Sequence, residues 1–234
     1  MLNKPTRSTV AGPRREFRTA ANGFAVPTQH YFYEPAIGHG LAHDPFKAII
    51  CPRPIGWIST CDSQGRPNLA PYSFFNAVCD APPAIAFASD GWKDSARNVE
   101  QTGEFAFNFV SQSLAEAMNR SSIIHERGVD EFAAEGIRSR PCLKIQPPCV
   151  AESIAVLECK LMHLVELKQY DGAETDYKLV VGQVVGVHLS EDFIKDGFFD
   201  VASARPVMRA GYRGEYVRIE PDHFFRMERP RNSY

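Results

Sequence analysis

The fold is decided by one continuous stretch, residues 53–110, which reads "RPIGWISTCDSQGRPNLAPYSFFNAVCDAPPAIAFASDGWKDSARNVEQTGEFAFNFV". Its first segment, "IGWISTC", is rich in β-branched residues and is bounded by Pro54 and by "DSQG". Gly65 suits the positive-φ position of a hairpin loop, so "RPNLAPYS" is predicted to return as the partner strand. The stretch therefore begins as an antiparallel β-hairpin.

The remainder of this stretch predicts a strand, a helix and another strand. "AIAFAS" is a short apolar run after two prolines, which is typical of a buried strand. "DSARNVEQTG" predicts a helix that Asp94 or Ser95 caps and Gly103 ends. "EFAFNFV" alternates with a period of two, which places Phe105 and Phe107 on one face of a strand.

Downstream of residue 110 the pattern predicts a short helix over 114–120, an irregular segment over 125–149 and then two long strands. In "SIAVLECKLMHLVELKQY" we expect Glu158 on a polar face and His163 in the core. Apolar residues interrupt that polar face, which favours a half-buried subunit interface. "KLVVGQVVGVHLS" returns as the next strand. The whole pattern predicts a mainly β fold with α insertions, an antiparallel barrel that is closed or split.

Composition excludes several classes of partner. The chain has 234 residues, 44% of them hydrophobic, with a formal net charge of -2, so no global field favours nucleic acid or a membrane surface. No apolar run approaches the roughly 20 residues of a membrane span. The six cysteines lack a CxxC spacing and are interpreted as reduced thiols of a cytoplasmic protein.

The expected domain organisation is a basic extended arm over 1–29 and a single domain over 30–234. The first eighteen residues carry five basic side chains with no apolar run after them. This is typical of a frayed arm or of one that packs on a partner subunit, and an amphipathic transit peptide is the alternative. His39 and His43 stand in a glycine-broken segment, so no metal site is predicted.

The start of the predicted helix is one candidate site. Unpaired N–H groups at a helix N-terminus, with Lys93 before them and the Ser95 hydroxyl beside them, suit a phosphate monoester. The alternative is that Ser95 only caps the helix and Lys93 is solvated. Neither a Walker motif nor GxGxxG is present, so neither a P-loop nor a dinucleotide-binding Rossmann site is indicated.

A second candidate lies in "PRPIGWISTCDSQGRPNLAPYSFFNAV", residues 52–78. Trp57, Phe74 and Phe75 are candidates for the apolar walls of a site for a planar ring, and Ser73 and Asn76 are candidate donors to it. The alternative is an ordinary aromatic core beside a hairpin whose loop residues bind the backbone. Spacing alone leaves the two readings open.

Taken in order, "RPIGWIST…DSQGRPNLAPYSFFNAV…PPAIAFAS…KDSARNVEQTGEFAFNFVS" resembles the flavin reductase-like family, with its FMN-binding split-barrel fold. Flavoredoxins and the small reductase components of two-component monooxygenases are members. The resemblance runs from about residue 45 to about residue 201. It implies FMN, or FAD, bound at the cleft of a homodimer, NADH or NADPH as reductant, and a monooxygenase or other redox protein as a possible partner.

The resemblance also implies site residues. Those near the flavin ring and its side chain are Arg53, Pro54, Ile55, Gly56 and Ser59. Those that wrap the ring and ribityl chain are Ser73, Phe74, Phe75 and Asn76, and those that take the phosphate are Ser89, Lys93 and Ser95.

His188, in "GQVVGVHLSED", is the candidate catalytic residue, with a strand-end histidine bonded to Asp192 or backbone as the alternative. Trp92 beside Lys93 is expected to narrow the pocket. Two other functions stay open: an electron-transfer flavoprotein without a nicotinamide groove, and a protein that binds FMN without turnover.

Overall fold

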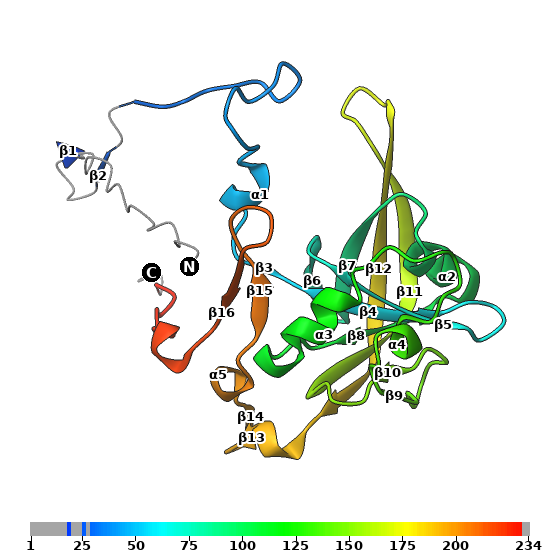
Figure 1. Cartoon of the computed structure of the whole chain (residues 1–234). Helices are drawn as coiled ribbons and strands as arrows, with labels where there is room; N and C mark the ends of the chain where they lie inside the picture. Colours follow the sequence, from blue (N-terminus) through cyan, green and yellow to red (C-terminus); the bar gives the residue numbers. More distant parts are fainter. Residues whose placement is uncertain (1–17, 20–24, 27–28, 231–234) are drawn as a thin grey trace, which may run out of the picture. The chain divides into compact units, whose positions relative to one another are not determined.

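The computed structural model describes residues 18–19, 25–26 and 29–230, and it divides into two units, Met1–Asp44 and Pro45–Tyr234 (Figure 1). In the first unit β1 (Arg18–Thr19) pairs with β2 (Ala25–Val26). Most of the predicted arm 1–29 lies outside the described residues, so that boundary stays a prediction.

The second unit is built on a seven-stranded antiparallel sheet with the order β5-β4-β8-β11-β12-β7-β6. Its strands are β4 (Gly56–Cys61), β5 (Pro67–Tyr72), β6 (Phe75–Asp80), β7 (Pro83–Asp90), β8 (Glu104–Asn108), β11 (Ala155–Lys168) and β12 (Glu174–Leu189). The hairpin of β4 and β5 and the strands at β7 and β8 are confirmed. Phe75 and Asn76, expected to wrap a ligand, begin the edge strand β6, which the sequence did not predict.

Smaller elements surround this sheet. The short strands are β3 (Arg53–Pro54), β15 (Val207–Arg209) and β16 (Tyr216–Arg218) in one sheet, β9 (Ser139–Arg140) with β10 (Cys149–Val150), and β13 (Ile194–Lys195) with β14 (Phe198–Phe199). The helices are α1 (Phe46–Ile49), α2 (Asp94–Thr102), η1 (Gln112–Leu114), α3 (Ala115–Arg120), α4 (Glu131–Ala134), η2 (Glu191–Phe193), α5 (Val201–Ala204) and η3 (Pro221–His223).

The large sheet curls, so that β5 at one edge contacts β7 near the other edge. Inside the curve a core forms from Ile58, Phe87, Phe105 and Val180, and Val99 of α2 closes it. Because residues of one strand alternate between the two faces, Ala106 of β8 joins a separate cluster on the outer side. The fold is mainly β and antiparallel with helical insertions, as the sequence predicts.

The N-cap residue of helix α2 lies one or two residues earlier in the chain than the sequence predicts. Its N-cap is Lys93, with no hydrogen bond from a capping side chain, whereas the sequence pointed to Asp94 or Ser95. Its end is as predicted, since Gly103 takes the left-handed conformation with φ of 71° and its N–H donates to the Val99 carbonyl. The first turn of α2 therefore keeps its N–H groups free of a side-chain cap.

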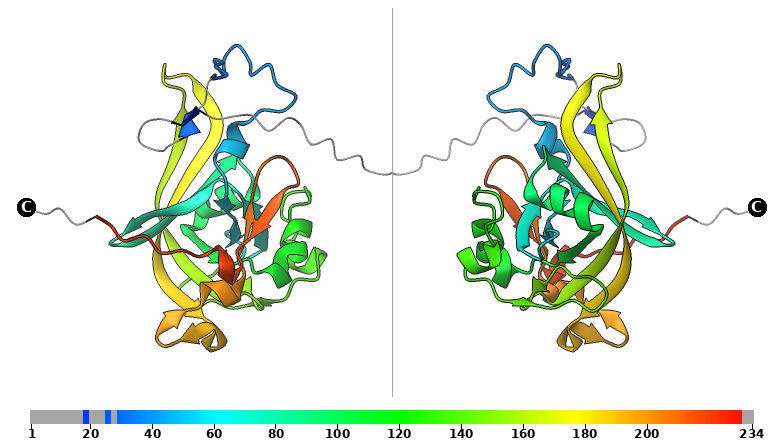
Figure 2. Two further views of the ribbon diagram at one scale, coloured as in Figure 1. Left: turned by 90° about the vertical axis from the view of Figure 1, so that its left-hand side faces the viewer. Right: turned by 90° about the vertical axis from the view of Figure 1, so that its right-hand side faces the viewer.

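The β11–β12 hairpin is the longest element, and in both views of Figure 2 its turn lies at one end of the Pro45–Tyr234 unit. Three register shifts interrupt the pairing of its strands, one of them between Glu158 and Cys159. The bulges change which side chains face the core. As a result Glu158, expected on a polar face, is fully buried, and His163, expected in the core, is exposed.

None of the helices in the described ranges has the length and apolar character that crossing a membrane requires.

Candidate functional site

A cleft of about 470 Å³ opens where the N-terminus of α2 meets the end of β5. Five parts of the second unit line it: α1, β5 with the residues after it, the end of β7 with the start of α2, the segment 121–131, and Tyr177 of β12. Four residues of the predicted cofactor site lie on its wall: Ser73, Phe74, Lys93 and Ser95.

The hydroxyl groups of Tyr72 and Ser95 line this cleft, and the predicted phosphate ligand Ser89 lies beside Tyr72 but does not line the cleft. The Ser95 hydroxyl accepts a hydrogen bond from the Asn68 amide at 2.9 Å, and the Ser89 hydroxyl donates to the Gly91 carbonyl at 2.9 Å. Both serines lie close enough to the Tyr72 hydroxyl to favour its ionised form, yet burial dominates and raises the pKa of Tyr72. Among the described residues none completes a hydrogen bond with the Tyr72 oxygen, which is buried. A bound ligand or an ordered water would complete the hydrogen bonding of a buried hydroxyl of this kind.

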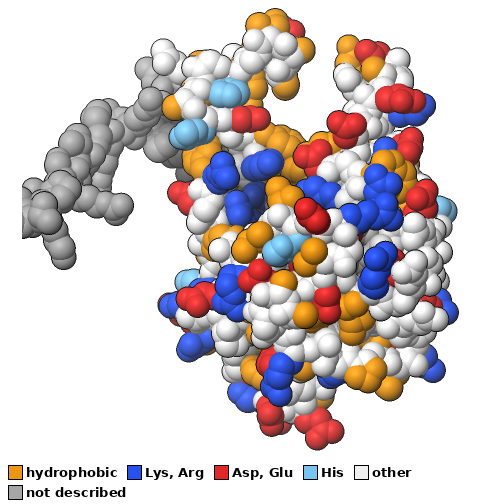
Figure 3. Space-filling model, turned by 45° about the vertical axis from the view of Figure 1, so that its right-hand side comes forward, with side chains coloured by type: hydrophobic (Ala, Val, Ile, Leu, Met, Phe, Trp, Pro, Cys, Tyr) orange, Lys and Arg blue, Asp and Glu red, His pale blue; other side chains and the backbone are white. Residues whose placement is uncertain are grey.

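The charges around the cleft are mixed. Lys47, Lys93 and Arg127 line it together with Asp90 and Asp94. The Asp94 carboxylate is engaged, because it accepts from the Gly128 N–H at 3.0 Å and lies 3.9 Å from Arg127. On the face shown in Figure 3, Lys and Arg side chains gather around the middle, with acidic and hydrophobic side chains between them.

Two aromatic rings, those of Phe74 and Tyr177, also line the cleft. The rings of Phe74 and Tyr177 lie 6.1 Å apart, and the Lys47 ammonium lies 5.6 Å from the centre of the Phe74 ring. The Ala88 N–H donates to the Phe74 carbonyl at 2.9 Å, which fixes the backbone there. The cleft thus offers an apolar, aromatic side and a polar side with a helix N-terminus.

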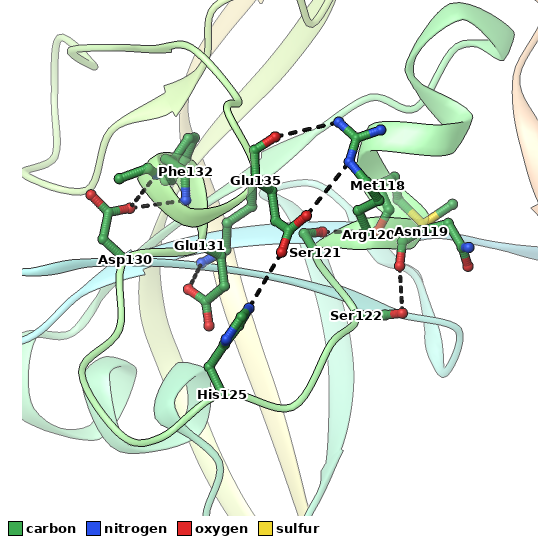
Figure 4. A network of polar contacts seen from close by, with 12 residues as sticks. Met118, Asn119, Arg120, Ser121, Ser122, His125, Asp130, Glu131, Phe132 and Glu135 are labelled. Atoms are coloured by element: carbon green, nitrogen blue, oxygen red, sulfur yellow. Dashed lines mark hydrogen bonds and ion pairs between the residues drawn. The ribbon is translucent and has the colours of Figure 1, made fainter.

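The segment 121–131 forms the remaining wall and is held by polar contacts (Figure 4). The Ser121 hydroxyl accepts from the buried Trp57 indole N–H at 2.9 Å. The His125 ring nitrogen Nε2 lies 3.5 Å from the Glu135 carboxylate, which Arg120 contacts from its other side at 3.5 Å. These contacts position His125 at the cleft.

Glu131 ties the same segment to the sheet. Its buried carboxylate accepts a hydrogen bond at 2.9 Å from the Leu69 N–H of the edge strand β5. Burial raises the pKa of Glu131, and the hydrogen bond from Leu69 opposes that effect only in part.

Sequence reasoning missed Tyr72, His125, Glu131 and Tyr177. Tyr72 stands within the motif "APYSFF", directly before the predicted site residues Ser73 and Phe74, and this position could have identified it as a candidate. The other three come from distant segments with no local signature.

Four other predicted residues do not line the cleft and make contacts within the chain. Phe75 stacks on Phe107 with ring centres 4.9 Å apart, and a Cβ at Gly56 would lie 2.5 Å from the Phe75 ring. The buried Ser59 hydroxyl accepts from the Asn108 amide at 3.1 Å. The Arg53 guanidinium donates to the Ile50 carbonyl at 2.7 Å and so closes the end of α1. Glycine at 56 is thus explained by ring packing.

The remaining predicted residues lie near the cleft or on its margin. Ile55 lines a neighbouring cavity of about 150 Å³ that shares Tyr72 and Ser73 with the cleft. Pro54 pairs with Met208 in the small three-stranded sheet. Asn76 is exposed on β6, and its side chain accepts from the Ala77 N–H at 2.9 Å. Trp92, expected to narrow the pocket, is not among the residues that line the cleft, and the Lys178 ammonium lies 5.3 Å from the centre of its ring.

The structure does not bring His188 to the cleft. Lys178 on β12 pairs with Ser89 near the cleft, whereas His188 pairs with Val156 toward the other end of the same strand. Ten residues of strand separate the two positions, about 30 Å. His188 hydrogen-bonds Glu158 there, not the expected Asp192 or backbone, and we give it no part in the proposed chemistry.

Comparison with known proteins places the chain among flavin-related proteins. An uncharacterized protein of Deinococcus radiodurans is 39% identical over 80% of this chain and 85% of its own length. A solved 2-nitrobenzoate 2-nitroreductase of Pseudomonas fluorescens is 26% identical, with a TM-score of 0.70 over 79% of this chain and 88% of that one. Component B of nitrilotriacetate monooxygenase from Bacillus cereus, 24% identical, shares the fold with a TM-score of 0.77 over 86% of this chain and 100% of that one. Residues 49–203 match the family described as flavin reductase like domain, and this chain belongs to that family.

Proposed function

We propose that this protein is an FMN-binding oxidoreductase, reduced by NADH or NADPH, that passes electrons to flavin or to a partner oxygenase. Membership of the family supports a flavin-binding redox role. The observation that carries the specific proposal is the orphaned Tyr72 hydroxyl beside Ser89 and Ser95, at a helix N-terminus without a side-chain cap.

The phosphate of FMN fits the polar side of the cleft. It is a dianion with several acceptor oxygens, and this side offers hydroxyl donors, the first-turn N–H groups of α2 and the Lys93 ammonium. Of the four basic or partly basic groups that line the cleft, Lys93 stands directly at the start of the helix. We therefore assign phosphate binding to Lys93 and Ser95, with Tyr72 as a further donor.

The ring system of a flavin fits the aromatic side. A volume of about 470 Å³ lies within the range of small-molecule sites, roughly 300–1,000 Å³. Phe74 and Tyr177 supply apolar area, and the backbone at Ser73 and Phe74 supplies hydrogen-bonding groups at its edge. These residues bind and orient a flat, half-polar ligand and exclude water from one side of it.

A bound flavin supplies the redox chemistry, which is the acceptance of a hydride and the release of electrons to an acceptor. The side chains of the cleft would then bind and position the flavin, and no acid–base step is assigned to them. Lys93 and the N-terminus of α2 neutralise the phosphate. Phe74 and Tyr177 would supply apolar contacts to the flavin ring, and the Lys47 ammonium beside the Phe74 ring would add a positive charge near it.

We further propose a homodimer. Large apolar side chains are exposed on β6, β11 and β12, namely Val78, Met162, Val165 and Val187, with exposures of 56%, 41%, 44% and 59%. Their burial against a second copy is consistent with the interrupted polar face noted in the sequence. Light scattering coupled to size-exclusion chromatography measures the mass of the protein in solution.

An oxygenase is included among the proposed electron acceptors because one structural neighbour is a monooxygenase component by name.

Titration of the purified protein with FMN and with FAD, followed by anaerobic addition of NADH or NADPH, tests the proposal. We expect saturable binding of FMN and bleaching of the bound flavin by one of the two nucleotides. Protein that binds FMN and is bleached only by dithionite would support the electron-transfer or non-catalytic alternative. Protein that binds neither flavin would overturn the proposal.

A further inference from the structure

A second, smaller cavity adjoins the cleft. Its volume is about 150 Å³, and Tyr72 and Ser73 are among the residues that line both spaces. The residues that line this cavity and not the cleft come from α3, β15, β16 and the position before β4, namely Ile55, Met118, Asn119, Arg209 and Tyr216. We call it the Arg209 cavity. The proposed flavin binding uses none of these five residues.

The lining of the Arg209 cavity carries a positive charge. Of the described residues that line it, Arg209 is the charged one, and none is an aspartate or a glutamate. The cleft differs in this respect, because Asp90, Asp94 and Glu131 line it together with its basic side chains. A cavity that presents a cation without an acidic side chain favours an anionic ligand.

A second guanidinium stands beside the first. Arg209 of β15 lies directly opposite Arg53 of β3 in their antiparallel pair, and these two strands are neighbours in Figure 1. Side chains of directly opposite residues lie on the same face of a sheet, and like charges in such a pair destabilise it. Arg53 is only 5% exposed, so water screens its charge poorly.

Neither guanidinium has a counter-ion in the part of the chain that the structure describes. Arg53 donates through Nη1 to the carbonyls of Lys47 and Ile50, and Arg209 donates through Nη1 to the Tyr216 hydroxyl at 3.1 Å. These acceptors are dipoles without net charge. The Nε atom of each arginine is buried and lacks a hydrogen-bond partner among the described residues. Because buried charges are costly when unpaired, an anion in the cavity would stabilise this pair of cations.

Two side chains hold the Arg209 guanidinium at the cavity. Its central carbon lies 4.7 Å from the centre of the Tyr216 ring, and the Tyr216 hydroxyl donates to the Asn119 amide oxygen at 3.3 Å. A guanidinium that rests on an aromatic ring is positioned in advance, so less rotamer freedom is lost when it binds a ligand. No described residue accepts a hydrogen bond from Arg209 Nη2. Arg209, which is half-buried, is therefore fixed and still has donors to offer.

The chemistry of the cavity favours a carboxylate. Guanidinium groups form strong, charge-assisted hydrogen bonds with carboxylates. The buried side chains of Ile55 and Met118 add an apolar lining for the hydrocarbon part of an organic acid. A volume of about 150 Å³ is smaller than a complete small-molecule site, roughly 300–1,000 Å³, so the cavity suits one group or a small molecule. A phosphate finds more donors in the cleft, at the N-terminus of α2.

We propose that the Arg209 cavity is a binding site for the carboxylate of a small organic acid. The carboxylate accepts hydrogen bonds from the Arg209 guanidinium, and the hydrocarbon part of the acid contacts Ile55 and Met118. Because Tyr72 and Ser73 line both spaces, the acid lies beside the ligand of the cleft. The proposal rests on the cavity alone and does not depend on the identity of the ligand in the cleft.

Saturation-transfer difference NMR with the full-length protein tests the proposal. The probe is butyrate, and butyramide is its uncharged isostere. Potassium chloride keeps the ionic strength constant, so a general effect of anions is the same in every sample. We expect butyrate to bind saturably with a Kd in the millimolar range, because a small ligand makes few contacts. Butyramide should bind at least about tenfold more weakly, since it lacks the charge that Arg209 recognises.

Three variants assign the binding to the cavity. Arg209→Gln removes the charge and is expected to weaken butyrate binding by about tenfold or more. Arg209→Lys keeps the charge and should retain part of the affinity. Arg213→Gln changes an exposed arginine in the connection between β15 and β16 and, as the matched control, should leave the butyrate Kd unchanged. The comparison of butyrate with butyramide uses the wild type, so a folding defect in a variant does not remove the test.

Three results would count against the carboxylate site: equal binding of butyrate and butyramide, a butyrate Kd that Arg209→Gln does not change, or displacement of butyrate by FMN. The last result would mean that the cavity belongs to the flavin site. We expect butyrate to bind in the presence of saturating FMN. Protein that binds butyrate but no flavin would contradict the proposed function and leave the carboxylate site standing, so the two failures are distinguishable.

Discussion

The Glu158 carboxylate on β11 accepts a hydrogen bond from the His188 ring on the neighbouring strand β12, and it is fully buried. It also accepts from the N–H groups of Leu143 and Lys144, so one side chain joins the long hairpin to the connection 141–148 between β9 and β10. Burial alone would raise the pKa of Glu158, but these hydrogen bonds outweigh it and the net pKa is lowered.

Glu158→Gln is expected to destabilise the protein by about 1–3 kcal/mol near neutral pH, because an amide cannot accept from all three donors. The pKa of Glu158 is lower in the folded state, so its contribution is present above the ordinary carboxyl pKa and is lost as pH falls through the folded value. The difference in the free energy of unfolding between the wild type and the variant should therefore become smaller at acidic pH. Urea unfolding at several pH values measures it. A difference that does not depend on pH would contradict the role given to the ionised carboxylate.

Lys93→Ala combined with Ser95→Ala is expected to weaken FMN binding by about 2–4 kcal/mol, because a charged and a neutral donor to the phosphate are both lost. Fluorescence titration with FMN measures the dissociation constant. Lys168→Ala combined with Ser63→Ala changes the same residue types at exposed positions outside the cleft and is the matched control. Riboflavin, which lacks the phosphate, should bind both double variants equally. An unchanged affinity for FMN would refute the phosphate assignment.

The variant Tyr72→Phe tests whether the Tyr72 hydroxyl binds the ligand or stabilises the fold. Without ligand its hydroxyl is buried and lacks a full hydrogen bond, so its removal should leave the free energy of unfolding unchanged or raise it. If the hydroxyl donates to bound phosphate, the affinity for FMN should fall by about 1.5–3 kcal/mol. Thermal unfolding and FMN titration on the same preparation measure both effects. A loss of stability with unchanged affinity would show that the hydroxyl serves the fold.

Gly56→Ala is expected to destabilise the fold by about 1–3 kcal/mol, because the new methyl group would lie 2.5 Å from the Phe75 ring in a packed site. The same change in a Phe75→Ala background should cost much less, since the ring is then absent. A double-mutant cycle by chemical denaturation measures the coupling. Equal costs in both backgrounds would mean that Gly56 is required for another reason, such as a ligand.

Local patterns predicted the strands and the main helix well. Alternation identified β8 and the β4–β5 hairpin, and Gly103 marked the end of α2, because side-chain period and left-handed backbone are properties of neighbouring residues. The N-cap was wrong by one or two residues, since several polar residues near a helix start compete for that position.

The candidate site was predicted less completely. Lys93, Ser95, Ser73 and Phe74 share the cleft because all lie beside the junction of β5, β7 and α2, within the stretch that resembles the family. His125, Glu131 and Tyr177 join them from segments that fold across the sheet. Arg53, Gly56, Ser59 and Phe75 were assigned to ligand by the resemblance, and their contacts in this structure are to the chain itself.

The sequence by itself determined the antiparallel elements, their order and the family, because periodicity, turns and linked motifs are written in neighbouring residues. Only the tertiary structure decided which polar side chains meet. It buried Glu158 with His188 and left the Tyr72 hydroxyl without a full hydrogen bond. The physical reason is that bulges and the curl of the sheet set long-range proximity, and a side chain's partners and pKa depend on that proximity.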